Sequence, residues 1–186
     1  RGRSRVPVAY LVCNFAPLSA DTPALLGHSD VITLLHETGH CLHHMLTEVE
    51  RPSVAGIAGY EWDAVELPSQ LMEDFGWDRD VLTSMSGHYR TGAELPAELF
   101  EKMMAARHFL SGMFVARQVE FALFDILLHL GTAGTDPIEL LEAVRDEVAV
   151  VRPPHWHRFP HAFSHIFAGG YASGYYSYLW AEVLAA

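Results

Sequence analysis

Two histidines four residues apart, His36 and His40, enclose Glu37 in the pattern H-E-x-x-H. The apolar residues on either side recur at steps of three and four, which predicts a helix. On a helix, positions i and i+4 lie on one face, so both imidazoles can reach a single ion, and imidazole nitrogens suit zinc. Glu37 would stand beside the pair, where a carboxylate can act as a general base without being a ligand. The pattern is typical of zinc peptidases.

A catalytic zinc site needs three protein ligands and an open position for water. Glu66 is the expected third ligand, so that His36, His40 and Glu66 would hold one Zn²⁺ per chain. Asp63 and Glu73 are candidates for carboxylates that orient the histidines, with an ordinary surface carboxylate as the alternative for each. The alternative for the motif as a whole is a chance match within a structural helix.

Composition restricts the class of protein. The 186 residues suffice for one domain with a hydrophobic core, and 50% apolar and 19% charged residues indicate a globular chain. A net charge of −11 without a basic stripe argues against a nucleic-acid partner. No run of apolar residues is long enough to predict a membrane span. Residues 1–5 and 6–12 imitate the start of a signal peptide, which we expect them not to be.

Cysteine usage is sparse. Cys13 and Cys41 are the two cysteines of the chain, too few for a disulfide framework. They are expected to be reduced or inert buried thiols, with a single bridge as the alternative.

The elements that position the candidate ligands are expected to be helices, with at most a short N-terminal strand at residues 8–15. The histidine helix is predicted to run from an N-cap at Ser29 to about residue 50. Asp63 is a candidate N-cap of the next helix, with Glu66 completing a capping box, a use that competes with zinc binding. Pro68 requires that this helix either begins just before it or bends there.

Most of the other expected elements are also helices, so the predicted fold class is mainly α, a multi-helix zincin-like segment. Residues 76–92 are expected to be irregular, with Pro96 as the first residue of the next helix. Residues 97–130 carry an apolar pattern typical of a core, broken at Ser111 and Gly112. A further helix is predicted at residues 137–151.

Three tyrosines near the C-terminal end could take part in chemistry. Tyr171, Tyr175 and Tyr178 are spaced i, i+4 and i+7, which would place them on one face of a helix. Beside a zinc site, neutral phenol hydroxyls are suitable donors to the negative charge that develops on a peptide oxygen. The alternative is a packed aromatic stripe whose hydroxyls bond to the backbone.

Four sequence segments stand in a recognisable order. They are residues 36–40 (HETGH), 54–59 (VAGIAG), 62–70 (WDAVELPSQ) and 161–180 (HAFSHIFAGGYASGYYSYLW). Together they resemble the thimet oligopeptidase family, and in particular its bacterial oligopeptidase A branch. The resemblance extends over nearly the whole chain. It implies a mainly helical, cytoplasmic zinc endopeptidase that acts on short peptides.

The resemblance also implies residue roles. Three residues match the family's zinc ligands: His36, His40 and Glu66. Glu37 matches the general base, and Tyr171 and Tyr178 match tyrosines that stabilise the tetrahedral intermediate or hold the substrate. Other matches are to residues that contact the substrate or border the cleft: Tyr175, His165, and Gly56 and Gly59 in the loop of residues 53–60.

The chain departs from the family in two ways. Thr38 stands where the family usually has Phe, and its side chain is expected to point away from the zinc. Family enzymes are several times longer and have a helical domain that forms the other wall of a deep channel. Residues 1–186 are therefore expected to form a single catalytic domain that is a fragment or shortened form of the family fold.

The short length leaves a second function open. Self-association or the missing helical domain would then cover the exposed apolar surface of the chain. The alternative to an enzyme is a non-catalytic, zinc-stabilised module that binds peptides or a partner.

Overall fold

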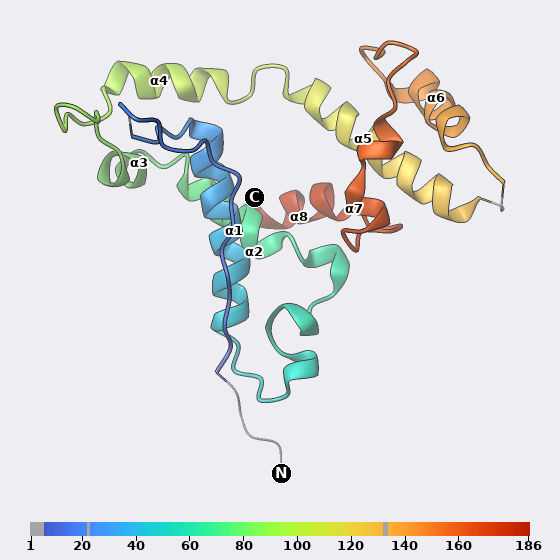
Figure 1. Cartoon of the computed structure of the whole chain (residues 1–186), viewed down its shortest axis with the longest axis horizontal. Coiled ribbons are helices and arrows are strands. Elements are labelled where there is room, and N and C mark those ends of the chain that lie inside the picture. The colour runs from blue at the N-terminus through green and yellow to red at the C-terminus, as the bar shows by residue number, and fades with distance from the viewer. Residues whose placement is uncertain (1–5, 22, 132–133) are drawn as a thin grey trace. The chain divides into compact units, whose positions relative to one another are not determined.

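The computed structural model describes residues 6–21, 23–131 and 134–186, and this part of the chain is mainly α-helical and contains no β-strand (Figure 1). The α-helices are α1 His28–Met45, α2 Leu67–Phe75, α3 Arg79–Met85, α4 Ala97–Ala106, α5 Ser111–Leu130, α6 Pro137–Val148, α7 Ser164–Phe167 and α8 Ser177–Ala185. Short 3₁₀ helices are η1 Pro52–Val54, η2 Gly56–Gly59, η3 Trp62–Ala64 and η4 Phe159–Ala162. The predicted mainly α class is confirmed.

Two compact units make up the chain. The first consists of the described residues up to Arg107 together with Ala181–Ala186, and the second of the described residues within His108–Trp180. The helices α1 to α4 belong to the first unit and α5 to α7 to the second, and the boundary falls within α8. The single domain expected over residues 1–186 stays a prediction.

Two sequence expectations concern membranes and export. None of the described helices is both long and apolar enough to cross a lipid bilayer. The basic segment 1–5, which imitates the start of a signal peptide, lies outside the described residues.

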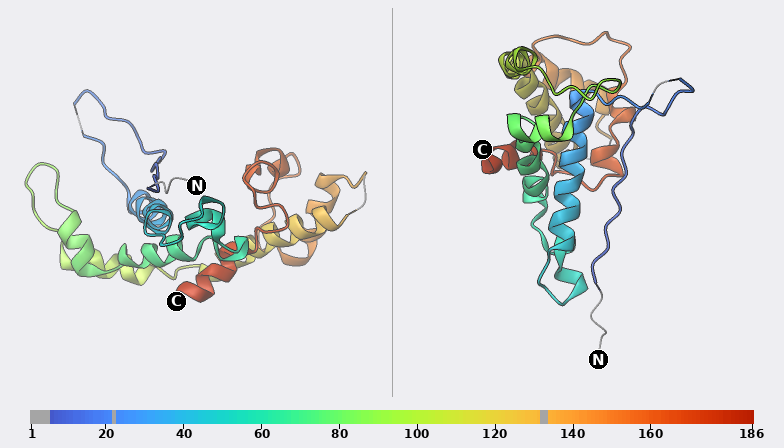
Figure 2. Two further views of the ribbon diagram at one scale, coloured as in Figure 1. Left: turned by 90° about the horizontal axis from the view of Figure 1, so that it is seen from below. Right: turned by 90° about the vertical axis from the view of Figure 1, so that its left-hand side faces the viewer.

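In the first unit, α1 and α2 lie side by side (Figures 1 and 2). A Cβ atom placed on Gly39 of α1 would lie 2.4 Å from the carbonyl oxygen of Pro68 and 2.6 Å from Cα of Ser69. Only a residue without a side chain allows the two backbones to approach this closely. Since α2 begins at Leu67, Pro68 lies in its first turn, where a missing N–H is tolerated. Of the two alternatives for Pro68, a helix that begins just before it is confirmed.

The start of α1 differs from the prediction. The helix begins at His28, and its N-cap is Gly27. Asp30 Oδ2 accepts the N–H of Gly27 at 2.9 Å, so the first-turn carboxylate closes the helix end. Ser29 therefore lies inside the first turn and is not the N-cap.

The end of α1 also comes earlier than predicted, at Met45 rather than near residue 50. The hydroxyl oxygen of Thr47 accepts the N–H groups of Val49 and Gly56, at 3.3 and 3.1 Å. These bonds satisfy backbone groups outside a helix and turn the chain into the following loop.

The capping box predicted for α2 is absent. Asp63 lies in η3, and Glu66 is itself the N-cap residue of α2, without a side-chain cap bond. The competition between capping and metal binding therefore does not arise, because the Glu66 carboxylate is directed elsewhere.

The strand predicted at residues 8–15 is also absent. This segment is extended and runs along α1 (Figures 1 and 2). Alternate side chains face solvent, with Tyr10 88% and Val12 78% exposed. A strand needs a neighbouring strand for its backbone hydrogen bonds, and the described residues contain none.

The middle of the chain contains one helix that was not predicted. Residues 76–92 include α3, whose N-cap Asp78 accepts a backbone N–H of the first turn at 3.0 Å. Pro96 is the N-cap of α4 rather than its first residue. A break within residues 97–130 is confirmed, but it lies at residues 107–110, where Leu110 has a φ of 57°, while Ser111 and Gly112 already belong to α5.

The core of the second unit lies between α5, α6 and the segment around α7. Phe124 and Leu141 are fully buried there. The apolar pattern of residues 97–130 therefore forms a core only in its second part, since Leu99 and Leu110 are 49% and 55% exposed. The helix α6 ends at Val148, slightly before the predicted residue 151.

Charged side chains are buried in the second unit as well. Glu120, Asp125 and Arg145 are each at most 1% exposed. Arg145 Nε donates to Glu120 Oε1 at 2.9 Å, and Arg117 Nη1 donates to the same oxygen at 2.5 Å. Buried Arg145 and Glu120 are thus paired with each other, as burial of a charge requires.

Candidate metal centre

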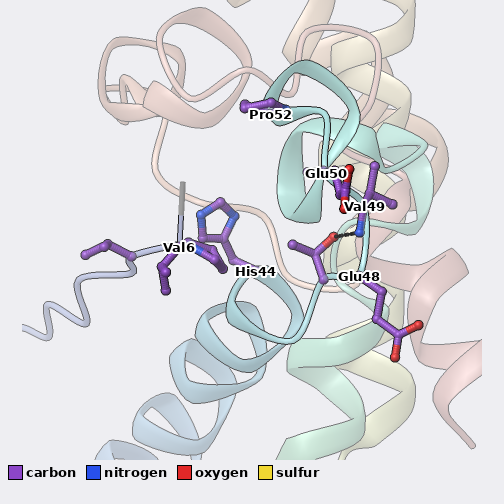
Figure 3. A pocket seen from close by; sticks show the side chains of 10 residues that line it. Val6, His44, Glu48, Val49, Glu50 and Pro52 are labelled. Carbon is purple, nitrogen blue, oxygen red and sulfur yellow. Dashed lines mark hydrogen bonds between the residues drawn. The ribbon is translucent and has the colours of Figure 1, made fainter. Parts of the chain in front are cut away.

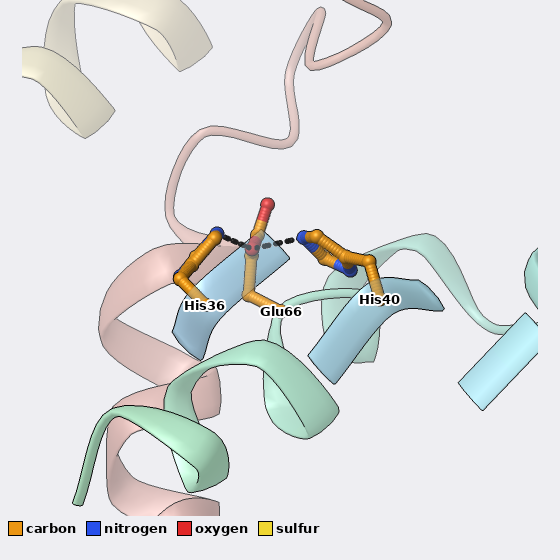
Figure 4. A group of neighbouring side chains, drawn as sticks. All are labelled: His36, His40 and Glu66. Atoms are coloured by element: carbon orange, nitrogen blue, oxygen red, sulfur yellow. Dashed lines mark ion pairs between the residues drawn. The ribbon is translucent and has the colours of Figure 1, made fainter. Parts of the chain in front are cut away.

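Glu66 stands between the two histidines predicted as ligands (Figure 4). Its Oε2 lies 3.2 Å from His36 Nε2 and 3.1 Å from His40 Nε2. The two imidazole rings are nearly perpendicular, at 85°, with centroids 5.0 Å apart. One donor atom from each residue lies within 4.8 Å of the other two, and the described part of the chain has no other such group of His, Cys, Asp or Glu.

The carboxylate of Glu66 is buried and contacts a serine of α2, the helix that follows it. Glu66 is 1% exposed and precedes α2, so the close approach of the two helices at Gly39 brings it to the histidine pair. The fully buried hydroxyl of Ser69 lies 2.9 Å from Glu66 Oε2 and 2.8 Å from the Glu66 carbonyl oxygen. Because a serine hydroxyl has one proton, it donates to one of these oxygens at a time.

Glu73, also on α2, contacts the other nitrogen of His36. Its Oε1 accepts from His36 Nδ1 at 2.6 Å, which leaves His36 Nε2 directed at Glu66. Partial burial lowers the pKa of His36, but hydrogen bonds to Glu66 and Glu73, together with their charges, outweigh that effect and raise the pKa to about 9. The cluster therefore attracts positive charge.

These residues fit a zinc ion. Zinc in catalytic sites takes three nitrogen or oxygen ligands from the protein and keeps one position for water. Both histidines present Nε2 to the same buried carboxylate, and the second nitrogen of His36 is bonded to a carboxylate, as is usual for metal-binding histidines.

Of the other motif residues on α1, Glu37 and Thr38 are half-buried and Gly39 is buried. Thr38 Oγ1 donates to the carbonyl oxygen of Leu34 at 2.7 Å, so this side chain is bonded to its own helix. Desolvation, and then electrostatic interactions with Glu37 and Cys41, raise the pKa of the Cys13 thiol. Both cysteines are free thiols in the structure.

The glycines predicted to border the cleft lie in η2, against the C-terminal turns of α1. A Cβ atom on Gly56 would lie 2.6 Å from His44 Nδ1, and one on Gly59 would lie 2.2 Å from a backbone carbonyl oxygen. Gly56 also has a φ of 53°, which favours glycine. A pocket of about 540 Å³ opens next to this loop, with Val6, His44 and Pro52 in its lining (Figure 3).

The tyrosines belong to the second unit, and they do not share one helix. Only Tyr178 is helical, because α8 begins at Ser177, after Tyr171 and Tyr175. The rings nevertheless cluster, with the Tyr178 centroid 5.2 Å from that of Tyr171 and 5.0 Å from that of Tyr175. The ring of His165, on α7, is 5.7–6.2 Å from all three. Tyr175 is 8% exposed and packs into the core.

Comparison with known proteins shows the family to which this chain belongs. The sequence profile of Peptidase family M3 matches residues 1–186. The chain belongs to peptidase family M3. It is 56% identical to Oligopeptidase A of Salmonella typhimurium and of Escherichia coli, over 100% of this chain but 28% of each of those proteins. It is 49% identical to the probable cytosolic oligopeptidase A of Arabidopsis thaliana, over 98% of this chain and 26% of that protein.

These identities confirm the resemblance to the thimet oligopeptidase and oligopeptidase A family. They also show that this M3 chain spans little more than a quarter of the length of these relatives, at 28% and 26%.

Sequence reasoning missed two residues that shape this M3 site. Gly39 lies inside α1, where a glycine is unfavourable unless close packing requires it. A glycine at this position in the sequence therefore could have indicated the close contact with α2. Ser69 lies three residues after Glu66, within reach of the Glu66 side chain once a helix begins there.

Proposed function

We propose that this chain is the catalytic segment of a zinc-dependent M3 endopeptidase that hydrolyses short peptides. The observation that supports it most is the convergence of His36 Nε2, His40 Nε2 and Glu66 Oε2 in a chain of a peptidase family. Held by these residues, zinc would supply Lewis-acid activation of a water molecule and polarisation of the peptide carbonyl.

Glu37 is the proposed general base. It follows His36 directly on α1 and so lies beside the ligand set rather than within it. Its carboxylate would take a proton from the attacking water and pass that proton to the departing amine. Glu73, through its bond to His36 Nδ1, and Asp63 in η3 are proposed to orient the ligands.

Tyr171 and Tyr178 are the proposed donors to the oxyanion. Phenols are neutral at pH 7 and can donate to charge that develops on the peptide oxygen, and loss of one such donor costs about 10²–10³ in rate. Their stacked rings form one cluster with Tyr175 and His165, which we propose to contact the substrate. The residues proposed to border the cleft are Gly56 and Gly59.

Short peptides are the proposed substrates because the similar proteins are named oligopeptidases. A cytoplasmic location stays a prediction. Activity of the chain on its own is part of the proposal, because the relatives are much longer than this chain.

Hydrolysis of an internally quenched fluorescent peptide by the zinc-loaded chain tests the proposal. We expect the wild type to cleave the peptide and a chelator to abolish cleavage. Glu37→Gln should lower kcat by about 10²–10⁴-fold, because the general base is lost, and should retain zinc. Glu101→Gln, which changes an exposed carboxylate of α4, is the matched control and should keep wild-type activity.

Two results would reject the enzyme assignment. Cleavage that survives complete removal of zinc would exclude the proposed role of the metal. Stoichiometric zinc in a wild type that is as inert as Glu37→Gln would favour the alternative, a zinc-stabilised module that binds peptides or a partner.

A further inference from the structure

A buried carboxylate in the second unit has no role in the chemistry proposed above. Asp125 lies on α5 and is 0% exposed. Burial of a negative charge is unfavourable unless its oxygens are hydrogen-bonded, so the contacts of Asp125 show what it holds.

Both oxygens of Asp125 accept from the backbone of the tyrosine segment. Oδ1 accepts the N–H of Ser173 and Oδ2 accepts the N–H of Tyr175, each at 2.9 Å. His129 Nδ1, one turn further along α5, lies 2.9 Å from Oδ1 and 2.8 Å from the Asp125 carbonyl oxygen. The carboxylate therefore ties α5 to the loop of residues 171–176, which we call the tyrosine loop.

The backbone of the tyrosine loop is unfavourable at the point where Asp125 binds it. Ser173 has a φ of 58°, in the left-handed region that residues other than glycine rarely adopt. The N–H of Gly174 donates to the carbonyl oxygen of Tyr171 at 2.8 Å, which closes the turn. A conformation of this kind persists when surrounding contacts enforce it, and Asp125 supplies two of them.

We propose that Asp125 is a positioning residue that fixes the tyrosine loop and thereby sets the places of the Tyr171 and Tyr178 phenols. The rings of Tyr171 and Tyr175 both contact the ring of Tyr178, so a shift of the loop backbone moves the whole cluster. The importance of this position for hydrolysis rests on the function proposed above for the tyrosines.

Asp125→Asn is the test variant, because it keeps the size of the side chain and removes its charge. The amide oxygen of the asparagine can accept one of the two loop N–H groups. Its NH₂ group then points at the other N–H, and two donors cannot form a hydrogen bond. Asp136→Asn is the matched control. Asp136 is also a carboxylate of the second unit that accepts backbone N–H groups, from Ile138 and Glu139, but it does so at the start of α6.

The first measurement needs no activity. Amide hydrogen exchange and the NMR signals of ¹³Cζ-labelled tyrosines are recorded on the full chain. In Asp125→Asn, the amides of Ser173 and Tyr175 should exchange at least about tenfold faster, because the hydrogen bonds that protect them are weakened and open more often. The NMR signals of the Tyr171 and Tyr178 rings should also shift. Neither change is expected in Asp136→Asn. Unchanged exchange and unchanged ring signals in Asp125→Asn would overturn the proposal.

A variant that fails to fold would give no answer, so a second one is included. Asp125→Glu keeps the charge and moves the oxygens by one methylene group. Where Asp125→Asn does not fold, Asp125→Glu is measured instead, and the same displaced ring signals are expected. Wild-type signals in that variant would count against the proposal.

The second measurement is kinetic. Asp125→Asn should lower kcat by about 10²-fold, the cost of a misplaced oxyanion donor, with zinc content unchanged and KM less affected. In a Tyr178→Phe background the same change should cost much less, because the donor is already gone. Equal losses in both backgrounds would refute the link to Tyr178. A wild type that cleaves no peptide would reject the proposed function, while exchange and ring signals would still decide whether Asp125 holds the loop.

Discussion

The donor atoms of the candidate metal centre are held by other side chains of the same helix pair. Glu73 fixes His36 through Nδ1, and Ser69 contacts the carboxylate of Glu66. A ligand set that is ordered in advance loses less conformational entropy when an ion binds. The affinity of the site therefore depends on residues that do not touch the ion.

Removal of one such residue should weaken metal binding without loss of a ligand. Glu73→Ala is expected to lower zinc affinity by about 10–100-fold, the usual effect of losing a carboxylate behind a histidine ligand. The measurement is competition with a zinc chelator of known affinity. Asp74→Ala is the control, since Asp74 follows Glu73 on α2 but pairs with Arg107 at 2.8 Å. Equal affinities of the two variants would contradict this role of Glu73.

At the level of single residues, the spacing of His36 and His40 predicted that they share a helix face, and the structure brings both to Glu66. Glu73 was named from the sequence together with Asp63, with a surface carboxylate as the alternative for each, because its contact depends on how α2 packs on α1. Ser69 was missed for a local reason, since it reaches the Glu66 side chain only because α2 begins at Leu67. Periodicity predicts faces of one helix, whereas contacts between helices depend on packing.

The packing of α2 against α1 brings Glu66 to the two histidines of the sequence motif, and the three residues form one cluster. The two backbones meet at Gly39, where a Cβ atom would lie 2.4 Å from the carbonyl oxygen of Pro68. A backbone atom cannot move aside as a flexible side chain can. The distance between the two helices, and hence the place of Glu66, depends on this glycine.

Gly39→Ala should force α1 and α2 apart. We expect a loss of about 1–3 kcal/mol in the free energy of unfolding, as for other overpacked sites, together with weaker zinc binding. Thermal denaturation and chelator competition measure the two effects. Gly112→Ala is the matched control, because Gly112 is also helical but has nothing within 4 Å of its Cβ position. That variant should be neutral or more stable, since alanine favours a helix. A Gly39→Ala protein as stable as Gly112→Ala would contradict the packing argument.

Elements were predicted well where the signal is local, and poorly where it depends on a partner. The helices around His36 and in residues 97–130 and 137–151 were found from apolar spacing and proline positions, with ends displaced by a few residues. The segment 8–15 has the composition of a strand, yet no described strand pairs with it. The spacing of the three tyrosines suited one face of a helix, but the tyrosine loop is not helical. The bond between Asp125 and the Ser173 N–H cannot be predicted from spacing.

At the scale of the whole chain, the two compact units have separate internal contacts. The candidate zinc ligands all lie in the first unit, and the hydrophobic core of buried Phe124 and Leu141 lies in the second. The second unit also contains the buried ion pair of Arg145 and Glu120. Damage to that pair should therefore affect the second unit and leave the ligands intact.

Glu120→Ala should destabilise the second unit by up to about 3–5 kcal/mol, because it leaves the buried Arg145 with only the exposed Glu142 as its carboxylate partner. Zinc content should stay at the wild-type level. The measurements are thermal unfolding and metal analysis of the same sample. Glu98→Ala is the control, since its pair with Lys102 is exposed and such pairs contribute about 0.5 kcal/mol or less. Loss of zinc from a folded Glu120→Ala protein would show that the centre depends on the second unit.

Zinc content of the purified chain, measured by mass spectrometry after dialysis against metal-free buffer, tests the central claim most directly. We expect about one zinc per chain in the wild type and in Glu37→Gln, and less than about a tenth in His36→Ala and Glu66→Ala, because a catalytic site needs all three protein ligands. A wild type that holds no zinc, or a Glu66→Ala variant that holds as much as the wild type, would contradict the assignment of His36, His40 and Glu66 as the metal ligands.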